Sequence, residues 1–215
     1  EAYSGDDPTL AQQPSPEESP FPPRRAFSNI AAPSFTVDHG THSLYNKEED
    51  RHDALVATIG GRVVHLAMVA DGHGGPQVAQ ICSENMLGRI VAEAKGDPSA
   101  ASLGEAGKRA FASIHAEVCA AFPGGSENQT PGTTCTIVAI CPSLEEVLVL
   151  NAGDSLGLFV PYSARRKTQK HKMITADHRL ESSPEEVERV LGMGGRIARA
   201  MNARGDPMGP IRSWP

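Results

Sequence analysis

Two β-rich runs of apolar residues, ALVATIG and RVVHLAMVADG, meet at the dipeptide Gly60-Gly61. Glycine adopts the positive φ angles that tight hairpin turns require. The pattern therefore predicts a β-hairpin in which the second strand leads directly into Asp71-Gly72-His73-Gly74-Gly75.

Helical periodicity follows this glycine-rich segment, first over residues 76–94 and then over 102–121. Apolar residues recur at three- and four-residue spacing, which predicts two consecutive helices with one buried face each. The residues expected to face inward are Val78, Ile81, Cys82, Met86, Ile90, Val91, Ala106, Ala110, Ile114, Val118 and Ala121.

Strand-like patterns return in the second half of the chain. TTCTIVAIC and EEVLVLNAG, linked by Pro142-Ser143, predict a strand pair, and residues 156–161 and 171–175 predict a further hairpin. Pro184 opens a helix that stops at Gly192, and the remainder from about residue 200 is expected to be irregular. Hairpins arranged around consecutive helices favour an antiparallel α+β fold over alternating βαβ units.

The first 34 residues differ from the rest of the chain. They are dense in Pro, Ser, Glu and Gln and lack a periodic apolar face, so they cannot bury enough surface to offset their ordering entropy. We expect a disordered tail over 1–34 and a folded domain over 35–215.

The charge and hydropathy of the chain limit its partners. A net charge of −6 gives no general attraction to nucleic acid or to anionic membranes. Apolar runs such as 147–150 are far too short to span a bilayer. We expect no nucleic-acid or membrane partner, and nothing indicates an obligate dimer, so a monomer is predicted.

The four cysteines are Cys82, Cys119, Cys135 and Cys141, and they form no CxxC pair and no zinc-finger spacing with a histidine. Thiols of this kind pack as small apolar side chains in a reducing compartment. We expect all four to be buried and the protein to be intracellular, either cytoplasmic or nuclear.

The segment Asp71-Gly72-His73 carries the strongest chemical signal. A carboxylate at the end of a buried strand is held on a rigid element, and the glycine lets the backbone approach a ligand closely. Mg²⁺ and Mn²⁺ prefer carboxylate, carbonyl and water oxygens, so Asp71 and the carbonyl of Gly72 are candidate ligands. His73 could donate a proton to a leaving group. From these residues alone, a simple turn stays an open interpretation.

Other acids lie near predicted strand ends. Glu49-Asp50 precedes the first hairpin, and Asp154 and Asp177 each follow an apolar strand. Each one alone fits a solvated charge run or a turn residue. Together they suggest acids converging on one site, because the hairpin can return Asp50 to the side of Asp71.

A resemblance to a known family rests on the ordered series EDR, VADGHGG, PGTTCTIVAI, LNAGDS, ITADH and EEVERVLGMGGRI. Over about residues 36–214 this series resembles the successive motifs of the type 2C (PPM) metal-dependent protein serine/threonine phosphatases. The resemblance implies a four-layer αββα fold, a β-sandwich flanked by helices. It also implies two Mg²⁺ or Mn²⁺ ions and a metal-activated water that hydrolyses phosphoserine or phosphothreonine in protein substrates.

The resemblance also implies roles for individual residues. Asp71 would bridge the two ions, Gly72 would supply its carbonyl, and Asp50, with Glu49 beside it, would hold metal directly or through water. His73 would be the general acid.

For four further positions the resemblance implies lesser roles. Asp154 matches the acid of a third, weaker metal site. Thr133, Thr134 and Asp177 match positions that support the site structurally.

Three departures from the family pattern bear on activity. Tyr45 stands where many members carry a phosphate-binding arginine, and Leu156 replaces the arginine that usually follows the GDS motif. The chain begins at Glu1 and stops after MGPIRSWP, ahead of the family's later acidic motifs. We therefore expect a piece of a longer or processed protein, with weak or no activity alone. The alternative is a non-catalytic pseudophosphatase that binds phosphoproteins or other partners.

Overall fold

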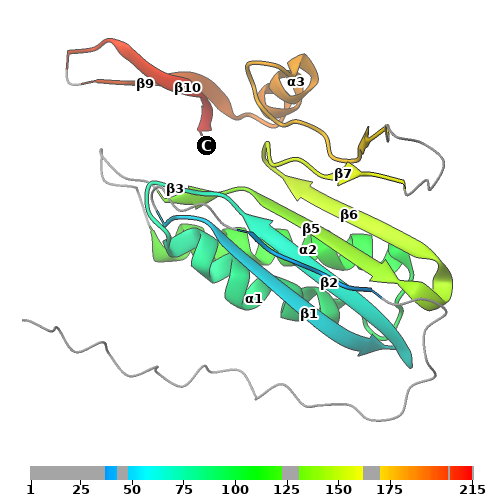
Figure 1. Ribbon diagram of the computed structural model, residues 1–215. Helices are drawn as coiled ribbons and strands as arrows, with labels where there is room; N and C mark the ends of the chain where they lie inside the picture. Colours follow the sequence, from blue (N-terminus) through cyan, green and yellow to red (C-terminus); the bar gives the residue numbers. More distant parts are fainter. Residues whose placement is uncertain (1–36, 43–47, 123–130, 162–169, 203, 215) are drawn as a thin grey trace, which may run out of the picture.

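The computed structural model describes residues 37–42, 48–122, 131–161, 170–202 and 204–214 (Figure 1). The predicted tail at 1–34 and the departure at Tyr45 lie outside these ranges, so they stay predictions, as does the boundary at residue 35.

A four-stranded antiparallel sheet forms the centre of the fold, in the order β1-β2-β5-β6 (Figure 1). Its strands are β1 (Arg51–Ile59), β2 (Arg62–Ala70), β5 (Cys135–Cys141) and β6 (Glu146–Ala152). Ile59 pairs with Arg62, and Gly60 and Gly61 between them have φ angles of 56° and 76°. The predicted hairpin and the reason for its turn are therefore confirmed.

Two helices cover one face of this sheet: α1 (Gln77–Glu93) and α2 (Ala100–Ala121) (Figure 1). Alternate residues of the strands, such as Leu66, Met68 and Ile137, are buried against them. Most of the predicted stripe is also inside, including Met86 and Ile114.

The prediction for Ala121 is wrong, because the final turn of α2 is exposed on all sides from residue 119 to residue 121. The prediction missed Leu103 and Gly107, which are buried in α2. A side chain at position 107 would have its Cβ 2.3 Å from Cδ1 of Leu150, so glycine lets α2 approach β6 closely.

Three of the four cysteines are buried, and all four are free thiols. Cys119 is exposed, so the prediction that it is buried is wrong. It lies on the outward face of α2, where its Sγ is 3.6 Å from Nε2 of His115 one helical turn earlier.

Short strands form two further pairs: β3 (Gly72–His73) with β4 (Gly132–Thr133), and β7 (Leu158–Phe159) with β8 (Lys172–Met173). The predicted hairpin at 156–175 is therefore present, although its strands are shorter than expected. A 3₁₀ turn (Pro142–Leu144) links β5 to β6.

The helix predicted at Pro184 is confirmed as α3 (Pro184–Gly192). Its N-cap is Ser183, whose side chain accepts a hydrogen bond from the backbone N–H of Glu186 at 3.3 Å. This bond satisfies one of the free N–H groups at the helix start.

The prediction that the end of the chain is irregular is wrong. Residues there form an antiparallel ribbon of β9 (Arg196–Met201) and β10 (Pro207–Trp214). The glycines that suggested irregular structure have local uses: Gly205 lies in the turn and Gly209 lies at a register shift, and both have positive φ.

The α+β class is confirmed. The described residues form a helical layer and one four-stranded sheet of the four-layer arrangement implied by the family resemblance. The sheet face opposite α1 and α2 carries exposed valines (Val56, Val69 and Val147). It borders a hollow of about 320 Å³ lined by residues of β2, β5 and β6 and by Leu158 and Ile174. Among the described residues, no helix is both long and apolar enough to cross a membrane.

Candidate metal centre

Asp71 lies at the end of β2, and its backbone is held by two threonines. Its N–H donates to Oγ1 of Thr134 at 3.1 Å. Its carbonyl accepts from the Thr134 N–H at 2.9 Å and from the Thr133 hydroxyl at 3.0 Å. These three bonds fix the position from which the Asp71 carboxylate projects.

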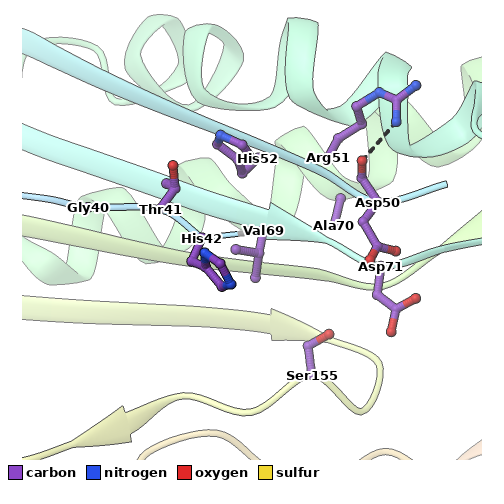
Figure 2. A pocket seen from close by; sticks show the side chains of 10 residues that line it. All are labelled: Gly40, Thr41, His42, Asp50, Arg51, His52, Val69, Ala70, Asp71 and Ser155. Atoms are coloured by element: carbon purple, nitrogen blue, oxygen red, sulfur yellow. Dashed lines mark hydrogen bonds between the residues drawn. The ribbon is translucent and has the colours of Figure 1, made fainter. Parts of the chain in front are cut away.

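The hairpin register places Asp50 beside Asp71. Arg51 pairs with Ala70, so the residues immediately before β1 and immediately after β2 lie at the same end of the sheet. Figure 2 shows the two carboxylates at one end of a shared cavity of about 390 Å³. This arrangement is the one predicted from the sequence, in which the hairpin returns the chain to its starting end.

Glu49 is bound to the glycine-rich turn that follows Asp71. Its Oε1 accepts a hydrogen bond from the N–H of Gly75 at 2.7 Å. A Cβ at position 72 would lie 2.3 Å from the backbone oxygen of Glu49, so Gly72 allows the two segments to touch. One carboxylate oxygen of Glu49 therefore supports the turn. The predicted role of Glu49 near a metal would use its other oxygen or a bridging water.

The surroundings of the Asp71 carboxylate disfavour its negative charge. The pKa of Asp71 is raised, first by burial and then by the negative charges of Asp50 and Asp154. Burial and like charge both disfavour the ionised carboxylate. A cation held between Asp50 and Asp71 would relieve this cost, so the donor set fits a hard divalent ion.

Asp154 lies on the loop after β6 and points to a different partner. Its Oδ2 accepts from Nε of Arg179 at 2.7 Å. Within the described ranges, no group of three or more His, Cys, Asp or Glu side chains is close enough together to hold one metal ion. The structure thus brings Asp50 and Asp71 together, whereas Asp154 lies close enough to affect the pKa of Asp71 but is paired with Arg179.

Asp177 has local structural contacts. Its carboxylate accepts from the backbone N–H of Arg179 at 3.0 Å and from the hydroxyl of Ser182 at 3.1 Å. The first of these bonds is the main cause of its lowered pKa. The neighbouring His178 accepts from the N–H of Gly153 at 3.3 Å, which ties this segment to the loop that carries Asp154.

His73 lies on β3, with its ring against Gly132, where an added Cβ would be 2.5 Å from Nε2. Partial burial lowers the pKa of His73, and the positive charge of Arg212 lowers it further, against the opposing carboxylate of Asp71. The imidazole is therefore mainly neutral at pH 7 in this state of the protein. A bound phosphate dianion would favour protonation of the ring.

Sequence reasoning missed several residues around the site. Ser155 is 2.7 Å from Thr134, oxygen to oxygen, and lines the cavity with Asp50 and Asp71. Arg212 lies on β10, a segment predicted to be irregular, so no pattern signalled its position.

Leu156 is 55% exposed, and it places no cation at the position where the family's arginine is expected.

These observations define an antiparallel α+β protein whose first hairpin brings two carboxylates together at one sheet end. A model of the protein phosphatase 2C family matches residues 41–206. Probable protein phosphatase 2C 12 of Arabidopsis thaliana is 30% identical over 199 residues, covering 89% of this chain and 44% of that protein. Probable protein phosphatase 2C 15 of the same plant is 33% identical over 147 residues, covering 68% of this chain and 32% of that protein.

A solved structure of a C. elegans sex determining protein matches with a TM-score of 0.56 at 22% identity, over 79% of this chain and 38% of that one, and it supports the fold. The chain belongs to the protein phosphatase 2C family. It spans less than half the length of the two plant relatives.

Proposed function

We propose that this chain contributes to a Mg²⁺- or Mn²⁺-dependent protein phosphatase that hydrolyses phosphoserine and phosphothreonine in intracellular proteins. The observation that carries the proposal is the convergence of Asp50 and Asp71 at the end of the first hairpin. Family membership supplies the reaction class, and the raised pKa of Asp71 supports a site that needs a cation.

Four groups of this chain are proposed to hold the ions. Asp71 would bridge them, Asp50 would bind directly or through water, and the carbonyl of Gly72 would complete one coordination sphere. Asp154 would serve a weaker site once it separates from Arg179. Bound ions would lower the pKa of a coordinated water and neutralise phosphoryl oxygens.

The remaining residues of the site position the reacting groups. The Thr133 and Thr134 bonds keep the Asp71 backbone in place, which limits the reorganisation needed at the transition state. His73 would protonate the leaving serine or threonine oxygen. Its lowered pKa means that this role requires substrate phosphate to raise the protonated fraction.

Phosphate release from a phosphothreonine peptide tests the proposal. We expect slow release by this chain in millimolar Mn²⁺, lost on chelation and in Asp71→Asn. Release that persists in both conditions would contradict the metal mechanism. Tight Mn²⁺ binding without any release would favour a non-catalytic phosphoprotein-binding role, which the family comparisons do not themselves support.

A further inference from the structure

The arginine that follows the acidic pair makes an unusual set of contacts. Nη1 of Arg51 donates to two backbone carbonyls, that of Glu48 at 2.8 Å and that of Asp50 at 2.8 Å (Figure 2 shows the second). Its Nε donates to Oε1 of Gln80 on α1 at 2.5 Å. One guanidinium thus joins the segment that carries Glu49 and Asp50 to the first helix.

The anchor on α1 is itself oriented. Nε2 of Gln80 donates to Oε1 of Glu84 at 2.5 Å, one helical turn further on. This bond assigns the amide nitrogen of Gln80 to Glu84 and leaves its oxygen facing Arg51. The bond between Arg51 and Gln80 is partly buried, whereas the bonds of Arg51 to the carbonyls of Glu48 and Asp50 are exposed to water.

The segment of Glu48, Glu49 and Asp50 includes a backbone conformation that its residues do not favour on their own. Glu48 has a φ of 57°, a left-handed conformation that non-glycine residues adopt only when neighbouring contacts hold them in it. The Arg51 bond to its carbonyl is one such contact. The bond from the N–H of Gly75 to the Glu49 side chain is a second contact on this segment.

We propose that Arg51 is a positioning residue for the candidate metal centre, holding Asp50 in place relative to Asp71 while Gln80 anchors the guanidinium on α1. The inference rests on the proposed function, because it concerns the same site. Arg51 thereby joins the start of α1 to the acidic pair, and the arrangement depends on the planar guanidinium of an arginine. Lysine has a single ammonium on a flexible stem and cannot make the three bonds in this arrangement.

The direction in which metal affinity changes when Arg51 is replaced distinguishes a positioning role from simple electrostatics. A positive charge close to a divalent ion repels it, so removal of the Arg51 charge should strengthen metal binding if electrostatics alone matters. A positioning role predicts weaker binding instead. Groups that orient metal ligands typically change affinity by about 10- to 100-fold when removed.

The test measures Mn²⁺ affinity from the electron paramagnetic resonance signal of free Mn²⁺. The variants are Arg51→Lys, Arg51→Met and Gln80→Met, the last of which keeps the arginine and its charge. Arg109→Lys is the matched control. Arg109 also donates through Nε to a side-chain oxygen and through Nη2 to a backbone carbonyl, both of Glu93 at the far end of α1.

We expect about tenfold weaker Mn²⁺ binding in both Arg51 variants, a loss in the same direction in Gln80→Met, and no change in Arg109→Lys. Near-ultraviolet circular dichroism of each metal-free variant checks that it is folded. Tighter binding by Arg51→Met, or unchanged binding in the Arg51 and Gln80 variants, would overturn the inference and leave the proposed function standing. Absence of Mn²⁺ binding by the unaltered chain would overturn the proposed function as well.

Discussion

Replacement of Gly72 by alanine tests the close approach on which the site depends. The new Cβ would be 2.3 Å from the backbone carbonyl oxygen of Glu49, 3.0 Å from its carbonyl carbon and 3.2 Å from Cβ of Ala79. Ordinary contacts begin at 3.4 Å, so the acidic segment must move by about 1 Å. Two of the three clashing atoms belong to the backbone, which cannot rotate away as a side chain can.

The energetic result combines two opposing effects. Overpacking costs about 1–3 kcal/mol, and the loss of glycine freedom in the unfolded chain returns about 0.4–1 kcal/mol. We therefore expect Gly72→Ala to lose about 1–2 kcal/mol in free energy of unfolding and to bind Mn²⁺ at least about tenfold more weakly.

Urea unfolding followed by circular dichroism, with and without Mn²⁺, measures both effects. Gly88→Ala is the control, since a Cβ at this exposed position in α1 meets nothing within 4 Å. It should raise stability by up to about 1 kcal/mol through helix propensity. Gly72→Ala with unchanged stability and unchanged Mn²⁺ binding would refute the packing of Glu49 on Gly72.

Three further changes probe neighbouring features. The pKa of Asp71 is raised in the folded state, so as pH rises above the ordinary value of 3.8 the folded state binds more protons than the unfolded state and loses stability. Asp71→Asn removes this loss, so it should stabilise the metal-free protein at pH values above this range. Urea titrations across pH should show the gain over the unaltered protein growing as pH rises, and a pH-independent difference would contradict the repulsion. Arg179→Met should change the free energy of unfolding little, because its ion pair with Asp154 is exposed, and should strengthen Mn²⁺ binding at a weaker site. Unchanged Mn²⁺ titration curves would place Asp154 outside the metal centre. Ser183→Ala should destabilise α3 by about 1 kcal/mol and speed its amide exchange, whereas Ser183→Asn should not, and equal exchange in both would rule out the cap.

The first hairpin shows how far the sequence could lead. Glycines at 60 and 61 set the turn, and near-equal strand lengths return the chain to its starting end, so the meeting of Asp50 and Asp71 followed from local patterns. The helix α1 was also predicted from a local pattern, the recurrence of apolar residues at three- and four-residue spacing.

Features that depend on tertiary contacts could not be predicted in this way. The Asp154–Arg179 pair joins residues 25 positions apart, and no spacing rule foretells an exposed ion pair at that separation. The contact of Arg51 with Gln80 could not be predicted either, since the two residues lie on different elements and 29 positions apart. The β9–β10 ribbon was missed because its glycines resemble loop signals when the pairing partner is unknown.

Anomalous X-ray diffraction from crystals of this chain soaked in Mn²⁺ tests the central claim most directly. We expect an anomalous peak within bonding distance of the carboxylates of both Asp50 and Asp71. Mn²⁺ bound elsewhere, with no peak between these two carboxylates, would contradict it.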